Sequence, residues 1–243
     1  MGILEEIHIL DNNHVNMENV SAGREISRFM RPELINNIDG FKGEDVVVFG
    51  KPTEIGEILD HQQGDNPFDA CGNCNLVSTA NFMNLCGISS ANETDITGYA
   101  ILHGECCYNY YSSPEELGGS TTQNMQNILK DFGISTEVVN PYDNEGKIES
   151  IATRLEEGYV GAMGVNAGYL WDDPFNVGDG RANHEVTLTG TVRDTNGELL
   201  ALTVCDSGTG EACHVVPIEQ LRDCYENVPG ADVVFTTEPM RII

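Results

Sequence analysis

The amino-acid sequence predicts an α+β fold, in which helices come first and an antiparallel set of strands follows. Between residues 75 and 157, apolar residues recur mainly at helical spacing. After residue 160 the pattern changes to short β-rich runs separated by turn signals. Hydrophobic residues make up 40% of the 243-residue chain, which is enough to form a core.

The beginning of the chain differs in composition from the rest. Residues 1–44 are polar and rich in asparagine, and we interpret them as an appended N-terminal segment. The remaining residues, 45–243, are then one domain, which opens with a β-like run over residues 45–50. A turn-rich stretch through residues 60–67 is expected to be a loop.

The regular elements follow from periodicity and from residues that stop helices. Helices are expected over residues 75–85, 93–103, 121–132 and about 147–157, and the first of these ends at Gly87. Strands are expected over residues 160–166, 184–192, 199–205, 214–217 and 232–236, with a short helix over residues 218–226.

The net charge limits the partners. With 39 acidic and 12 basic residues, the formal net charge is −27, and no cluster of lysine or arginine occurs. Such a surface repels phosphate backbones and anionic lipid headgroups, so we expect no nucleic-acid and no membrane partner. We see no secretory signal and no long apolar run, and therefore expect a cytoplasmic protein or one secreted without a classical signal peptide.

The eight cysteines allow three interpretations. An even number suggests disulfides, and the Cys71–Cys74 spacing is that of half a zinc site. No second pair with metal-ligand spacing exists, so we expect neither a metal nor a cofactor. Some of these thiols are expected to be ordinary buried side chains.

Cys74 lies at the first turn of the predicted 75–85 helix. The helix dipole and the free backbone N–H groups there favour a thiolate, which lowers the pKa of a cysteine toward the reactive range. A buried structural cysteine is the alternative interpretation.

The predicted hairpin over residues 184–206 contains a second pair of reactive groups. A three-residue loop with Gly197 left-handed would pair Asp194 with Glu198. Counting back from that turn puts Asp206 opposite Val186, so His184 and Asp206 share one face as diagonal neighbours. A carboxylate there could orient an imidazole, as in a Cys-His-Asp triad. A surface histidine and a turn-capping aspartate are the alternatives.

Three motifs together carry a resemblance to a known family. Cys71-Gly-Asn-Cys74-Asn-Leu-Val-Ser78 resembles the cysteine motif of papain-like peptidases, Asn183-His184-Glu-Val is similar to their histidine strand, and Cys205-Asp206-Ser-Gly resembles their third motif. The segments Glu93–Ala100 and Gly118–Thr121 extend the likeness to a bacterial branch that includes bacteriocin-leader-processing peptidases and papain-fold toxin domains.

The resemblance implies an N-terminal helical lobe that carries the cysteine helix, packed on a C-terminal antiparallel sheet that carries the histidine and the aspartate. It also implies that Cys74 is the nucleophile, His184 the general base and acid, and Asp206 the orienting carboxylate. The family's oxyanion hole uses a glutamine upstream of the cysteine, for which we choose Gln63, with Gln62 as the neighbouring choice. Cys71 is the rival nucleophile.

The leading hypothesis is therefore a cysteine hydrolase that cleaves a peptide or amide bond in a peptide or protein substrate through an acyl-enzyme on Cys74. A glutamine deamidase or transamidase effector with the same triad is the second hypothesis. A non-enzymatic binding module on the same scaffold is the third, favoured by Asn75, which stands where papain has an aromatic residue. Trp171, the only tryptophan, either lines a substrate cleft or packs into the core.

Overall fold

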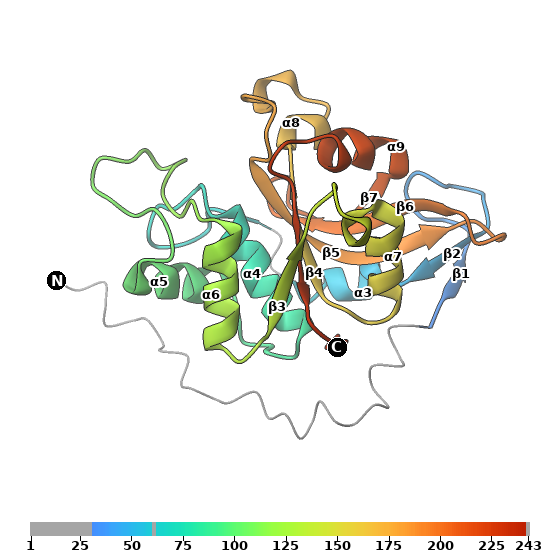
Figure 1. The fold of residues 1–243 in the computed structure, drawn as a ribbon, viewed down its shortest axis with the longest axis horizontal. Helices are drawn as coiled ribbons and strands as arrows, with labels where there is room; N and C mark the ends of the chain where they lie inside the picture. The colour runs from blue at the N-terminus through green and yellow to red at the C-terminus, as the bar shows by residue number, and fades with distance from the viewer. Residues whose placement is uncertain (1–30, 60–61, 242–243) are drawn as a thin grey trace.

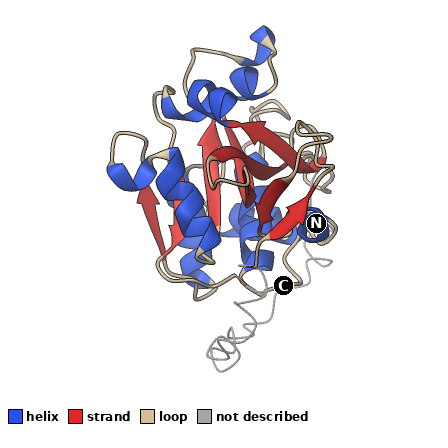
Figure 2. Ribbon diagram, turned by 90° about the vertical axis from the view of Figure 1, so that its right-hand side faces the viewer, coloured by secondary structure: helices blue, strands red, loops and turns tan. Residues whose placement is uncertain are grey.

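The computed structural model describes residues 31–59 and 62–241, and these form two packed parts (Figure 1). Helices α4 (Cys74–Leu85), α5 (Glu93–His103) and α6 (Thr122–Asp131) lie together at the left of the view, and an antiparallel sheet occupies the right. Figure 2 shows the strands at the centre of the molecule with helices outside them. The predicted α+β arrangement, with a helical lobe packed on a sheet, is confirmed.

Eight strands in the described residues form this sheet, in the order β1-β2-β5-β4-β8-β3, with β6 on β5 and β7 on β6. All pairings are antiparallel. The bounds are β1 Glu33–Ile35, β2 Val46–Phe49, β3 Thr136–Val139, β4 Gly161–Val165, β5 His184–Arg193, β6 Leu199–Asp206, β7 Glu211–Pro217 and β8 Val233–Thr236.

The predicted helices and strands all occur, with ends that move by a few residues. The helix predicted over residues 147–157 is α7 (Ile148–Glu156), and that over 218–226 is α9 (Ile218–Leu221) continued by a wider π-type turn. The strand β7 begins at Glu211, three residues earlier than predicted. Six further short elements were missed; each has only three to five residues, which give little periodicity. They are β1, β3, α3 (Pro52–Gly56), α8 (Ala167–Leu170) and two 3₁₀ turns, Asn144–Gly146 and Pro174–Asn176.

The sheet is buried on both faces, because helices cover each one. Ala162 of β4 and Val234 of β8 pack with α4, α5 and α6, whereas Met163 and Phe235 pack with α7 and α9 on the opposite face. Successive residues of a strand point to opposite faces, so both central strands are continuously apolar. The face that carries Ala162 and Val234 thereby packs α4 directly against the sheet.

The β5–β6 hairpin has the register that the turn predicted. Asp194 donates its backbone N–H to the Glu198 carbonyl at 2.8 Å, and Gly197 has φ +91°. The two strands then contain two bulges, one that adds Leu200 to β6 and one that adds Thr189 to β5. The bulges compensate, so Thr187 faces Cys205 and the same register places Asp206 opposite Val186.

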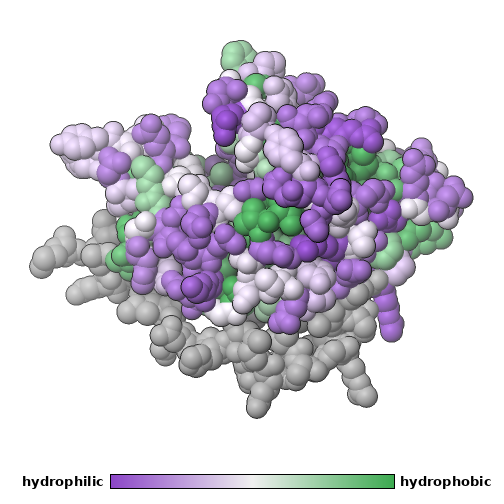
Figure 3. Space-filling model, viewed as in Figure 1, coloured by the Kyte–Doolittle hydropathy of each residue, from purple (hydrophilic) through white to green (hydrophobic). Residues whose placement is uncertain are grey.

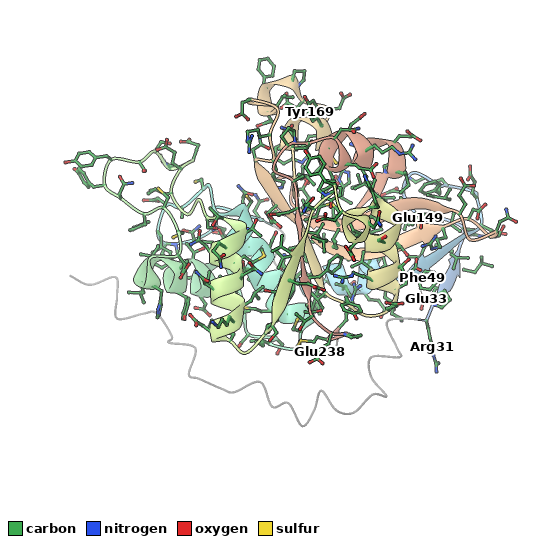
Figure 4. All side chains as sticks on the ribbon, viewed as in Figure 1. Arg31, Glu33, Phe49, Glu149, Tyr169 and Glu238 are labelled. Atoms are coloured by element: carbon green, nitrogen blue, oxygen red, sulfur yellow. The ribbon has the colours of Figure 1, made fainter. Side chains whose placement is uncertain are left out.

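Part of the segment predicted as appended belongs to the sheet. Residues Glu33–Ile35 pair with β2, and Ile38 is buried against Val46 and Val48. Glu33 and Phe49 accordingly lie at the same edge, at the right of Figure 4, far from α4 to α6. Residues 1–30 lie outside the described residues, and the division of the chain at residue 44 stays a prediction.

The face seen in Figure 3 is mostly hydrophilic, with a small apolar area near its centre. A notch separates the helical lobe at the left from the upper part of the sheet lobe. Within the described ranges, none of the helices has both the length and the apolar character needed to cross a bilayer.

Candidate active site

Cys74 is the first residue of α4, and the preceding residue fixes its position. Asn73 is fully buried, and its Nδ2 donates to Glu93 Oε1 at 2.7 Å and to Thr97 Oγ1 at 3.1 Å on α5. One turn into α4, Ser78 Oγ donates to the Glu185 carbonyl of β5 at 3.1 Å. The start of the cysteine helix is therefore tied to both α5 and β5.

The close approach of the loop over residues 115–118 to the residues before Cys74 requires a glycine in each of the two backbones. A Cβ at Gly72 would lie 2.2 Å from the Glu115 carbonyl, and one at Gly118, whose φ is +84°, would lie 2.6 Å from the Asn73 side chain. Only residues without a Cβ let the two backbones come this close. Gly118 belongs to the motif that the sequence singled out, and packing explains why it is glycine.

His184 and Asp206 meet across the β5–β6 pair. His184 Nε2 and Asp206 Oδ1 are 2.8 Å apart, and both side chains are buried. Asp206 also accepts from Trp171 Nε1 at 2.7 Å and from the Gly208 backbone N–H at 2.9 Å. The ring centroids of Trp171 and His184 are 5.1 Å apart. A Cβ at Gly208 would lie only 2.4 Å from the Trp171 ring, so the indole packs directly on this glycine. Trp171 therefore covers the His–Asp pair and fixes the carboxylate.

Cys74 and His184 form a hydrogen-bonded pair. Because Asp206 occupies Nε2, Nδ1 is the ring nitrogen left for the thiol. Burial alone would raise the pKa of Cys74, but the hydrogen bond and charge of His184 outweigh it, so that pKa lies below its ordinary value. Burial likewise opposes the imidazolium, yet Asp206 and Cys74 raise the pKa of His184 to about 10. The arrangement favours a thiolate–imidazolium pair.

The Asp206 carboxylate completes this charge arrangement. Burial would raise its pKa, but the hydrogen bonds from His184, Trp171 and Gly208 hold the pKa of Asp206 down at about 2. Asp206 is therefore ionised near pH 7, and its negative charge stabilises the imidazolium form of His184.

The other cysteines differ from Cys74. All eight cysteines lie in the described residues, and each is a free thiol. Burial raises the pKa of the Cys86, Cys106, Cys213 and Cys224 thiols, with Cys106 at about 11 and Cys224 at about 12. Cys71, the rival nucleophile, is exposed in the loop before α4, whereas the thiol bonded to His184 is that of Cys74.

Gln63 lies between the aspartate motif and the loop before the cysteine helix. Its backbone N–H donates to the Ser207 carbonyl at 3.0 Å, and its Oε1 accepts from Ser207 Oγ at 3.1 Å. Its Nε2 donates to the Cys71 carbonyl at 2.8 Å, and an amide nitrogen carries a second N–H. The neighbouring choice, Gln62, is exposed and its Nε2 is 3.4 Å from the Gln63 carbonyl.

Glu93 connects the loop that contains Gln63 to the start of α4. Its Oε1 accepts from the Gly64 N–H at 2.6 Å and from Asn66 Nδ2 at 2.8 Å, in addition to Asn73. One buried carboxylate at the start of α5 thus fixes both the Gln63 loop and the residue before Cys74. Sequence reasoning did not assign Glu93 this function, and the only signal was its place in the Glu93–Ala100 motif.

A cavity of about 360 Å³ opens beside Cys74 and His184. Its other walls come from residues 119–122, from the end of β4 and from the residues before β5 and β8. Asn75 lines it and accepts from Ser120 Oγ at 2.9 Å. No cluster of three or more metal-ligating side chains occurs in the part of the chain that the structure describes.

Sequence reasoning placed Cys74, His184, Asp206 and Gln63 together, and the structure brings all four to the junction of α4 with the sheet. It did not decide the position of Trp171, whose N–H binds Asp206 while the indole packs beside His184. A single tryptophan shortly before the histidine strand was the available signal.

The chain matches no protein-family model and no curated protein. Among solved structures it resembles one described as a C39-like peptidase from Bacillus anthracis, with 13% identity over 76% of this chain and 96% of that chain and a TM-score of 0.50. Two lower-scoring matches are a double glycine motif protease from an AMS/PCAT transporter in complex with its leader peptide (15% identity, 68% and 84% coverage, TM-score 0.38) and UfSP from C. elegans (11% identity, 75% and 33% coverage, TM-score 0.45). The chain has the papain-like peptidase fold.

Proposed function

We propose that the protein is a cysteine hydrolase that cleaves a peptide or amide bond of a peptide or protein substrate through an acyl-enzyme on Cys74. The observation that carries this proposal is the hydrogen-bonded series Cys74–His184–Asp206 at the wall of a cavity. Nucleophile, base and orienting group are each within reach of the next, which is the arrangement that nucleophilic catalysis requires.

In the acylation step, the Cys74 thiolate attacks the carbonyl carbon of the scissile bond, and the carbonyl oxygen becomes an oxyanion. His184, as imidazolium, donates its Nδ1 proton to the leaving nitrogen while the C–N bond breaks. The products are a thioester on Cys74 and a free amine, and His184 is left neutral.

The oxyanion needs donors that point at its developing charge. Two are available: the backbone N–H of Cys74, which has no helical acceptor in the first turn of α4, and Gln63 Nε2. In deacylation, neutral His184 takes a proton from water, the hydroxide attacks the thioester, and the thiolate–imidazolium pair is restored. Asp206, held by Trp171, keeps the imidazole oriented through both steps.

The test is to incubate the full chain with a complex mixture of unmodified peptides and to read new termini by mass spectrometry. The wild type is expected to generate cleavage products, Cys74→Ala to generate none, and Cys71→Ala to behave like the wild type. Cys71 is a matched control because it is an exposed thiol three residues earlier. Equal cleavage by Cys74→Ala and the wild type would overturn the proposal.

The deamidase hypothesis uses the same acyl-enzyme, and mass spectrometry separates the two. Hydrolysis of a glutamine side chain shifts an intact target by about 1 Da, whereas peptide cleavage gives fragments. The binding-module hypothesis predicts neither product and no fast alkylation of Cys74.

A further inference from the structure

Two carboxyl groups line the same cavity as Cys74 and have no part in the reaction described above. Glu185 follows His184 on β5, and its Cα pairs with Gly164 of β4. Asp232 lies just before β8 and also lines the cavity. Thr122 Oγ1 donates to the two Asp232 oxygens at 2.9 and 3.2 Å.

Glu185 is held in a fixed orientation with one oxygen unused. The residue is 6% exposed, and within the described part of the chain its Oε1 has no hydrogen-bond partner. Its carboxyl group accepts from Asn75, whose own Oδ1 accepts from Ser120. A buried polar atom without a partner is unusual in a folded protein, and a ligand in the cavity that Glu185 lines could supply the missing bond.

The two carboxyl groups face one space. The point where a Cβ would stand at Gly164 lies 3.4 Å from Asp232 Oδ1 and 3.5 Å from Glu185 Oε2. Because residue 164 has no side chain, the region between the two acids stays open. An ammonium or guanidinium group that entered it could bind both carboxylates.

No cation is paired with either acid in the described part of the chain, although one guanidinium lies near the cavity wall: Arg181 Nη2 is 3.2 Å from the point where a Cβ would stand at Gly230. Neither Glu185 nor Asp232 forms an ion pair with lysine or arginine among the described residues, and the nearby charge of His184 is already bound to Asp206. Burial, then the charges of Asp232 and Cys74, raises the pKa of Glu185 well above its ordinary value, and burial also raises that of Asp232. A bound cation would relieve this repulsion.

We propose that Glu185 and Asp232 form an acidic subsite that selects substrates with a lysine or arginine side chain close to the scissile bond. This proposal rests on the proposed function, because it assigns the cation to the substrate of Cys74. The subsite shares a cavity with Cys74, so the basic residue lies within a few positions of the cleaved bond. The net charge of −27 would also draw cationic peptides toward the protein.

Binding to the Cys74→Ala chain tests the subsite without any need for catalysis. The probes are acetyl-Ala-Lys-Ala-amide and acetyl-Ala-norleucine-Ala-amide, which differ only in the charged end of one side chain. Calorimetric titration is expected to give about tenfold tighter binding of the lysine peptide. Adding Glu185→Gln or Asp232→Asn should remove most of this preference, and Gly164→Ala should reduce it by filling the space between the acids. Glu238→Gln, an exposed acid at the lower edge of Figure 4, is the matched control and should keep the preference.

A second measurement uses the wild type and Glu185→Gln without Cys74→Ala. Cys74 is alkylated with 2-bromoethylamine or with 2-bromoethanol, and the ratio of the two rates is expected to fall about fivefold in Glu185→Gln. Equal binding of the two peptides to the Cys74→Ala chain would overturn the acidic subsite and leave the proposed function standing. If Cys74 reacts with neither reagent, the proposed function fails, and the titration still decides the subsite.

Discussion

The two ends of helix α4 each carry a cysteine, and the two thiols have opposite properties. Cys74 begins the helix and Cys86 follows its last residue, and each has a basic side chain nearby. Yet the pKa of Cys74 is lowered, while burial raises that of Cys86 despite the charge of Arg241.

Two differences explain this contrast. The N-terminal end of a helix stabilises negative charge, whereas the C-terminal end disfavours it. In addition, His184 is hydrogen-bonded to Cys74, whereas the Arg241 guanidinium donates to the Gly50 and Thr189 carbonyls. A nearby cation alone is therefore insufficient to lower the pKa of a buried thiol in this protein.

The largest expected effect is the difference in reactivity between these two thiols. With iodoacetamide at pH 7 on the native protein, Cys74 is expected to react at least about 10³-fold faster than Cys86. Peptide mapping by mass spectrometry after timed quenching measures both rates in one sample. Comparable alkylation rates for Cys74 and Cys86 would contradict the proposed difference between the two helix ends.

Substituting His184 tests which difference matters more. In the wild type, the thiolate fraction rises as pH increases through the lowered Cys74 pKa, and the imidazolium persists until pH approaches about 10. In His184→Ala the charge and the hydrogen bond of the imidazole are lost, while burial, the helix end and the backbone N–H groups of Glu185 and Asn75 still act on the thiol. Its pKa therefore rises, and alkylation at pH 7 should fall about 10²-fold. A pH–rate profile that moves to higher pH is the expected result. An unmoved profile would assign the effect to the helix end and the backbone donors, and not to His184.

Gln63 should affect turnover without affecting the thiol. If its Nε2 stabilises the oxyanion, Gln63→Ala lowers kcat by about 10²-fold. Alkylation by iodoacetamide forms no oxyanion, so its rate should stay within about twofold of the wild type. Parallel loss of both rates would mean that Gln63 positions the loop before α4 and does not act on the reacting atoms. Gln62→Ala is the matched control.

The smallest expected effect is that of Trp171→Phe. This change keeps most of the indole's packing next to His184 but removes the N–H that donates to Asp206 at 2.7 Å. We expect kcat to fall about tenfold or less, since one of three donors to the carboxylate is lost. A fall as large as that in His184→Ala would give Trp171 a larger function than orientation of Asp206.

Local patterns predicted the parts of this site that lie on regular elements. The start of α4 and the turn at Gly197 followed from periodicity and glycine positions. Thr187 faces Cys205, and extending this register by one residue places Asp206 opposite Val186 as expected. That register was correct although no local pattern indicated the two bulges. Their effects cancel, so counting from the turn reached the right residue.

The remaining parts depend on contacts between distant segments. Glu93 binds Gly64, Asn66 and Asn73, which lie 20 to 29 residues away. The Glu185–Asp232 pair is brought together only by the pairing of β4 with β5 and β8. Neither residue type nor spacing predicts these long-range contacts, because the packing of the elements determines them.

The compensating bulges in β5 and β6 also restrict how this hairpin can change in length. Deleting Leu200 alone would move Asp206 by one position along β6 and turn its side chain to the other face of the sheet. Deleting Thr189 alone would displace His184 in the same manner. Removing both residues together would restore the register. A deletion or insertion at one of the two positions is therefore tolerated only with a matching change at the other. Variants of this hairpin that keep a working His–Asp pair should therefore gain or lose residues in both strands at once.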